Sequence, residues 1–438
     1  MPSRVAFMFR AFAYPNYRLF FGGQIVSLIG SWISMTATSW LVYRLTGSAM
    51  ALGVVGFAGQ FPGFVMGPFA GALLDRWDRH RMLVVTQSLS MLQSFLLALL
   101  TFTGHITVEA IVVLNAVQGV VNAFDMPARQ AFVPTIISDR EDLANAIAMN
   151  SSMFNAARLI GPSIAGLLIA AAGEAWCFFV DGISYFAVII ALLAMKDVRR
   201  QHRPAAHPGM MAHLLEGWRY VAGFRPIRSL MLQLAWLCLV AMPFSVLMPV
   251  FAETILGGGP HTLGLLMGAS GLGALLGALW LTTRKSVVGL GRVILINTVV
   301  FGGGLIGFAL SQWLWLSLVF MTVAGFGMMV QMGSTNTVIQ TIVDEEKRGR
   351  VMSFYVMSFL GTAPFGSLLA GWLSTRIGAQ QTVFLSGVLC VATAGWFARE
   401  LPAIRVLVRP IYMRMGILPE VAEGLQTATN LMTPPEQD

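Results

Sequence analysis

Long apolar segments recur along this chain, and they limit its possible folds more than any other feature. A helix that crosses about 30 Å of hydrocarbon needs about 20 mostly apolar residues. Segments of that kind lie at 18–43, 50–74, 82–103, 107–125, 143–171, 176–195, 227–252, 262–283, 290–309, 313–336, 350–375 and 380–399. Since only helices and closed barrels satisfy the backbone inside a bilayer, we predict an all-α membrane protein with twelve transmembrane helices.

The composition excludes an ordinary soluble protein. Of 438 residues, 56% are hydrophobic and only 11% are charged, whereas soluble globular domains carry about 25% charged residues. So little charge cannot cover the surface of a soluble chain of this length.

The distribution of positive charge predicts how the helices are oriented. The formal net charge is +8, and Arg and Lys concentrate in alternate connections between the apolar segments, as the positive-inside rule expects. Only Arg44 and Arg376 fall in the other set of connections, and Arg158 lies within an apolar segment. We therefore expect a multi-pass protein of the cell inner membrane, with both termini in the cytoplasm and no nucleic-acid partner.

The longest connection divides the chain into halves of similar size. It contains Trp218 and Val221 at helical spacing, which predicts an amphipathic helix. The expected organisation is an N-terminal six-helix bundle at 1–195, a cytoplasmic linker at 196–226, a C-terminal six-helix bundle at 227–400 and a disordered cytoplasmic tail at 401–438.

Glycine pairs indicate that the two halves are repeats. Gly161 and Gly166 in the fifth apolar segment recur at the same spacing as Gly366 and Gly371 in the eleventh. Each pair follows a charged connection, as expected for transporters built from parallel repeats.

Two motifs suggest conformational roles. The connection after the second segment combines an aspartate with basic residues, a cluster that can latch one conformation through charge-assisted hydrogen bonds. Its residues are Gly71, Asp75, Arg76, Arg79 and Arg81. The fifth segment combines a proline with small residues, which allow a close helix contact. These residues are Gly161, Pro162, Ala165 and Gly166.

Both motifs resemble those of the major facilitator superfamily. The first matches its hallmark loop, with Asp78 where the family usually has glycine, and the second is similar to a helix of its drug antiporters. Segments 16–24, 125–162 and 216–228 resemble the exporter branch that includes the enterobactin exporter and macrolide-efflux-like proteins. The resemblance implies two pseudo-symmetric six-helix bundles, a monomer, export by proton antiport, and a cavity surrounded by the first, fourth, seventh and tenth helices.

Polar residues at helical spacing on three of those helices, and aromatic residues on the seventh, indicate what the cavity binds. A half-polar, half-apolar cavity suits an amphipathic organic molecule. The predicted cavity residues are Gln24, Ser31, Asn115, Gln118, Asn122, Trp236, Phe244, Gln331 and Thr335.

Three charged residues inside the apolar segments are candidates for coupling or for buried ion pairs: Arg158, Asp181 and Asp125. A charge at the bilayer centre costs at least about 2.5–3.5 kcal/mol, so each is a functional candidate. Arg158 pairs either with an anionic substrate or with a carboxylate in a structural ion pair. For Asp125 we expect capping of a helical segment that begins at Met126.

The leading hypothesis is a secondary active exporter of small amphipathic molecules, drug-like or siderophore-like, that works by alternating access and proton antiport. The alternative is a lysolipid flippase or a facilitator of the same superfamily. A membrane-embedded enzyme is disfavoured because the six histidines are dispersed in or near connections and no nucleophile–base set is evident. No nucleotide-binding loop or metal-ligand spacing occurs, so we expect no cofactor or metal.

Overall fold

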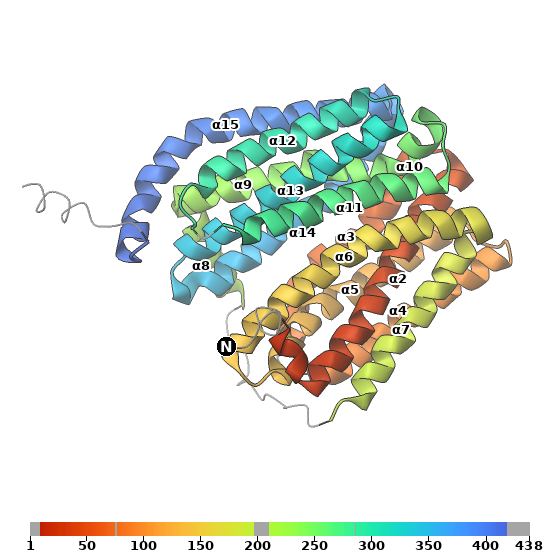
Figure 1. Ribbon diagram of the computed structural model, residues 1–438, viewed down its shortest axis with the longest axis horizontal. Helices are drawn as coiled ribbons and strands as arrows, with labels where there is room; N and C mark the ends of the chain where they lie inside the picture. Colours follow the sequence, from red (N-terminus) through yellow and green to blue (C-terminus); the bar gives the residue numbers. More distant parts are fainter. Residues whose placement is uncertain (1–8, 75–76, 197–209, 285, 418–438) are drawn as a thin grey trace, which may run out of the picture.

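Long helices form the whole architecture, as the sequence predicts. The computed structural model describes residues 9–74, 77–196, 210–284 and 286–417, and no strand occurs in these ranges. Twelve helices are long and apolar enough to cross a membrane, which confirms the predicted all-α multi-pass fold. They form two groups that follow each other in the sequence (Figure 1).

The first half contains a short 3-10 helix and six long helices. They are η1 (Arg10–Ala13), α2 (Pro15–Thr46), α3 (Ala49–Leu74), α4 (Arg79–Phe102), α5 (Val108–Ile136), α6 (Arg140–Ala172) and α7 (Glu174–Ala194).

The second half begins with the short helix α8, which is followed by six membrane-spanning units. The seventh span combines α9, η2, α10 and η3. The elements are α8 (Met210–Gly223), α9 (Arg225–Val240), η2 (Met242–Leu247), α10 (Met248–Val250), η3 (Phe251–Ile255), α11 (Pro260–Thr282), α12 (Leu290–Leu310), α13 (Leu314–Ile342), α14 (Glu345–Ile377) and α15 (Ala379–Arg414).

The seventh span is broken because prolines interrupt its hydrogen-bond ladder. Pro243 lies in the 3-10 helix η2 and Pro249 in the short α10, followed by the π-helical turn η3. Proline lacks the amide hydrogen that a helix interior requires, so tighter and wider turns replace the regular helix.

The hydrophobic core is shared by the two halves at one end only. We call the end that carries the connection from α7 to α9 the linker end, and the opposite end the distal end. One apolar cluster at the distal end joins residues of both halves, including Leu41, Phe178, Phe251 and Leu266. At the linker end each half has a separate cluster. The halves are therefore packed together distally and divided at the linker end.

Glycines allow the two halves to approach closely at the distal end. A Cβ on Gly166 of α6 would lie 3.1 Å from the Cα of Gly264 on α11, and a Cβ on Gly53 of α3 would lie 3.2 Å from the Cα of Gly371 on α14. Such contacts hold helices together where lipid offers no hydrophobic driving force.

The glycine repeat expected from the sequence occupies equivalent places in the two halves. Gly161 faces Ile29 and Trp32 of α2, and Gly366 correspondingly faces Leu239 of α9 and Pro243, all within the residue's own half. The second glycine of each pair faces the opposite half, as described above. The two pseudo-symmetric six-helix bundles are thus present.

The final helix extends beyond the predicted start of the tail. We expected disorder from residue 401, but α15 continues to Arg414. Its last turns have a buried apolar face formed by Leu401, Ile404, Val408 and Tyr412. This spacing of three to four residues stabilises a helix against the bundle, and the polar character of the other face obscured it.

We predict that Gly264→Ala destabilises the protein. A Cβ at this position would lie 2.6 Å from the carbonyl oxygen of Pro162 and 3.0 Å from the Cα of Gly166. Overpacking a dense interior costs about 1–3 kcal/mol. Thermal denaturation of the purified protein in detergent should therefore begin at a lower temperature.

Gly303→Ala is the matched control, because a Cβ there has no neighbour within 4 Å. Alanine favours a helix over glycine by about 1 kcal/mol, so this variant should be as stable as the wild type or slightly more stable. Equal denaturation temperatures for the two variants would contradict the proposed close contact.

Candidate functional site

Asp125 lies in a buried polar cluster between α4 and α5. Its carboxylate accepts hydrogen bonds of 2.7 Å from the Thr86 hydroxyl and from the Gln87 amide. It also forms an ion pair with Arg129, one turn further along α5. The expectation that Asp125 caps a helix beginning at Met126 is wrong, because α5 continues to Ile136 and passes through two prolines.

Asp181 on α7 is another buried carboxylate, and its environment differs from that of Asp125. It is 2% exposed, and one carboxylate oxygen accepts a hydrogen bond of 2.7 Å from the Ser94 hydroxyl of α4. The other oxygen has no hydrogen-bond partner among the described residues. No described cation forms an ion pair with Asp181, whereas Asp125 has Arg129.

The polar face of α4 connects these carboxylates to the predicted residues of α5. Gln118 donates to the Ser90 hydroxyl at 3.0 Å and to the side-chain amide oxygen Oδ1 of Asn122 at 3.1 Å. We did not predict from the sequence that α4 contributes to this site, although its polar residues recur at every fourth position. The buried polar residues of this face are Thr86, Gln87, Ser90, Gln93 and Ser94.

The other predicted residues of the first half lie close to this cluster or beside it. Ser31 is within 3.2 Å of the Tyr185 hydroxyl of α7. Asn115 lies against Gly59 of α3, which has no side chain to separate the two helices. Gln24 is fully buried, and neither polar atom of its amide has a partner among the described residues.

The predicted residues of the second half are less closely connected. Gln331 donates to Thr335 of the same helix, α13, and both side chains are buried. Phe244 is buried against Phe301, with ring centroids 6.1 Å apart, and belongs to the apolar cluster that the two halves share. Trp236 is exposed on α9. The structure therefore gathers the predicted polar residues in the first half and leaves those of the second half dispersed.

The predicted latch is only partly described. Asp75 and Arg76 lie outside the described residues, and Gly71 lies in the last turn of α3. Arg79 donates to the carbonyl oxygen of Ala131 on α5 at 3.1 Å. The side chain of Asp78, which replaces the family's usual glycine, accepts a hydrogen bond from the backbone N–H of Arg81 at 3.0 Å and caps α4. Aspartate suits this position because its carboxylate satisfies a free amide.

The antiporter-like helix lies at the contact between the halves. Pro162 is inside α6, and its carbonyl oxygen faces Gly264 of α11. Ala165 is fully buried. These small residues, with Gly161 and Gly166, give α6 two close neighbours, α2 of its own half and α11 of the other.

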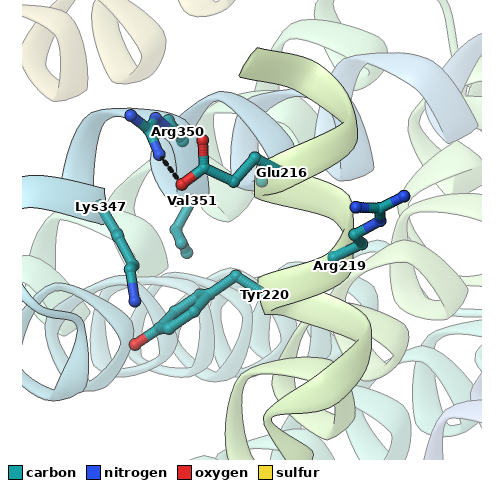
Figure 2. Close-up of a pocket in the computed structure, with 7 residues that line it drawn as sticks. Glu216, Arg219, Tyr220, Lys347, Arg350 and Val351 are labelled. Atoms are coloured by element: carbon teal, nitrogen blue, oxygen red, sulfur yellow. Dashed lines mark ion pairs between the residues drawn. The ribbon is translucent and has the colours of Figure 1, made fainter. Parts of the chain in front are cut away.

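A surface pocket of about 280 Å³ lies between α8 and the start of α14 (Figure 2). Glu216 forms an ion pair with Arg350 across this pocket, and the Lys347 ammonium group lies 4.6 Å from the ring centroid of Tyr220. Burial raises the pKa of the Tyr220 phenol. These contacts hold α8 against α14 of the second half.

Two helical bundles with a polar interior, a shared distal core and separate cores at the linker end define a multi-pass membrane transporter. The chain belongs to the transmembrane secretion effector family of the major facilitator superfamily, whose profile matches residues 7–408. This confirms the predicted superfamily, and the family consists of transporters rather than enzymes.

Curated relatives and solved structures are similar over nearly the whole chain. The staphyloferrin A transporter of Staphylococcus aureus is 25% identical, covering 87% of this chain and 95% of its own. Macrolide efflux protein A of Streptococcus pyogenes is 24% identical, covering 87% and 96%. The crystal structure of a bacterial homologue of the human lysosomal transporter Spinster, inward-facing and unoccupied, has a TM-score of 0.70 at 15% identity, covering 89% and 98%.

We predict that Arg129→Gln destabilises the protein by leaving the Asp125 carboxylate without its cation. Removing one partner of a buried ion pair costs about 3–5 kcal/mol. We expect the lower end of that range because the Arg129 side chain is 23% exposed. The measurement is thermal or chemical denaturation in detergent.

The double variant Asp125→Asn/Arg129→Gln is the control for that prediction. It removes both charges, so it should recover part of the loss, and a double-mutant cycle should show coupling between the two positions. Strictly additive effects would mean that the ion pair contributes nothing to stability.

Proposed function

We propose that this transporter exports small amphipathic organic molecules, drug-like or siderophore-like, in exchange for protons. The observation that carries the proposal is Asp181, a carboxylate buried in the membrane-spanning region without a described cation partner. An unpaired buried charge is costly. The cost of holding the charged carboxylate therefore changes when the halves move and the surroundings of Asp181 change. A proton-driven antiporter requires such a link between proton binding and conformation.

Alternating access would arise from rocking of the two halves. The shared distal core and the separate cores at the linker end correspond to a conformation open at the linker end. The three described hydrogen bonds between the halves join Thr36 to Met267, Tyr43 to Thr254 and Gln60 to Ser367, all on the distal side. The opposite conformation requires these contacts to open.

The substrate class is proposed from the relatives and from the polar residues of the first half. A siderophore transporter and a macrolide efflux protein are similar to this chain over most of their length. Gln118 and Asn122 offer polar contacts on α5, and Trp236 offers an exposed aromatic surface on α9. This combination suits an amphipathic solute.

The cellular setting proposed is the inner membrane of a bacterium, with both termini in the cytoplasm and the protein acting as a monomer. The positive-inside distribution of Arg and Lys supports this orientation. In this orientation the linker end faces the cytoplasm, and the residues Gly71, Asp75, Arg76, Arg79 and Arg81 would latch one conformation there.

We predict proton-driven uptake into energised inverted membrane vesicles that contain this protein. The panel should comprise amphipathic drugs and a siderophore, each with and without a protonophore. The gradient supplies about 2.3 kcal/mol per charge per 100 mV, so wild-type uptake should collapse when the protonophore is added. Uptake that ignores the protonophore would rule out proton antiport, and movement of lysolipid alone would favour a flippase.

A second prediction concerns Asp181→Asn, which removes the ionisable group but keeps its shape. Concentrative uptake should fall by about tenfold or more, whereas exchange of substrate across the membrane without a gradient should continue. Glu174→Gln is the control, since Glu174 pairs with Arg44 at the distal end, and it should transport normally. Undiminished concentrative uptake by Asp181→Asn would exclude Asp181 as the proton carrier.

A further inference from the structure

Arg158 is a cation in the middle of α6 whose charge the described residues do not neutralise. Two other arginines in long helices show what such pairing looks like, because Arg129 pairs with Asp125 and Arg225 with Glu400. No described carboxylate forms an ion pair with Arg158. Holding a charge at this depth costs at least about 2.5–3.5 kcal/mol, so the position requires a compensating interaction.

The exposure of one face of α6 shows where Arg158 lies. Positions on this face are three or four residues apart and therefore lie above one another. Towards the linker end, Ile147, Ser151 and Phe154 are exposed, and towards the distal end, Gly161 and Ala165 are buried. Arg158 is between these two groups and is itself partly exposed.

This face is distinct from the lipid-facing side of the helix. Ile160, Ile164 and Leu167 are exposed and apolar, as expected for contact with lipid. At 100° per residue they point roughly to the opposite side from Arg158. The exposed part of the Arg158 face therefore borders the division between the two halves, and Arg158 lies where that division closes.

Two aromatic rings of the first half lie near Arg158, and a glycine of the second half faces its backbone. Phe154, one turn before it, packs edge-on against Trp32 of α2, with ring centroids 5.9 Å apart. A Cβ on Gly271 of α11 would lie 2.9 Å from the carbonyl oxygen of Arg158. A solute at this place would meet a fixed positive charge, two aromatic rings and the opposite half.

None of the three described buried carboxylates of the first half is placed to neutralise Arg158. Glu174 is paired with Arg44 at the distal end. Asp125 is engaged by Arg129, Thr86 and Gln87. Asp181 is hydrogen-bonded to Ser94 of α4, and its helix α7 packs mainly on α2 and α4.

We propose that Arg158 binds the anionic group of the transported molecule, so that the substrates are amphipathic organic anions. This inference rests on the proposed export function and narrows its substrate class. A guanidinium forms two parallel hydrogen bonds with a carboxylate or a phosphate, and the rings of Trp32 and Phe154 supply apolar contact for the body of the molecule. Neutral molecules of the same shape are bound more weakly.

The test is equilibrium binding to purified protein in nanodiscs of phosphatidylcholine, without a proton gradient. The probes are dansylglycine, which carries a carboxylate, and dansylglycinamide, which differs only in being uncharged. Energy transfer from tryptophan to dansyl reports binding. Hydrogen bonds to charged groups contribute about 1.5–3 kcal/mol, equivalent to about a 10- to 150-fold change in affinity.

The wild type should bind dansylglycine at least about tenfold more tightly than dansylglycinamide. Arg158→Gln should remove that difference by weakening the binding of dansylglycine alone. Arg158→Lys should retain most of the difference. Arg376→Gln is the matched control, because Arg376 lies against Trp372 near the distal end of α14, and it should bind both probes as the wild type does. Denaturation temperatures establish that each variant is folded.

Several results would overturn the assignment. These are equal affinities of the wild type for the two probes, binding of neither probe, or an Arg158→Gln variant that loses both probes or neither. Competition by lysophosphatidylglycerol but not by unlabelled aryl carboxylates would identify the anion as a lipid headgroup and overturn the solute assignment. Since this assay needs no gradient, proton-driven export can fail in vesicles independently of it.

Discussion

The glycine contacts between opposite halves are the interaction on which the rest of the structure depends. Gly166 faces Gly264, and Gly53 faces Gly371, so the backbones approach without interlocking side chains. Around these contacts the two halves share one apolar core. Small residues hold helices at close range yet leave no side chains to disengage when the halves separate. The same contact can therefore close one end of the molecule and later open.

The polar interior is unevenly divided between the halves, although both derive from the same helical pattern. In the first half, α4 presents Thr86, Ser90 and Ser94 to neighbours on α5 and α7. In the second half, the Gln233 amide of α9 donates to Thr298 of α12 at 3.0 Å, and no carboxylate takes part in this bond. We infer that the buried carboxylates that could bind protons belong to the first half. The second half supplies the surface against which the first half moves.

Some features could be predicted from the sequence because they depend on one helix at a time. Length and hydropathy locate each span, and the spacing of Gly161 and Gly166 predicts a close helix contact. The environment of Asp125 could not be predicted, because α5 continues past two prolines and the partners Thr86 and Gln87 come from another helix. The extension of α15 to Arg414 depends likewise on a buried face that forms only against the bundle.

The residues of the candidate site divide in the same way. Gln118 and Asn122 share a face of α5, so their contact follows from helical spacing. Phe244 looked like a cavity residue because it is aromatic, but whether it faces Phe301 or a solute depends on the packing of α12. The position of Arg158 at the boundary between exposed and buried stretches requires both halves to be in place.

Distances between spin labels at the two ends of the molecule would test the central claim most directly. One pair of labels, at Ser152 and Thr283, reports the linker end. The other pair, at Thr46 and Thr375, reports the distal end. All four residues are exposed. The native cysteines Cys177, Cys238 and Cys390 are buried, so labelling can be directed to introduced ones. Between acidic and alkaline buffer, with substrate present, the two distances should change in opposite directions. If both pairs keep fixed distances, or lengthen together, the two halves do not rock about their glycine contacts.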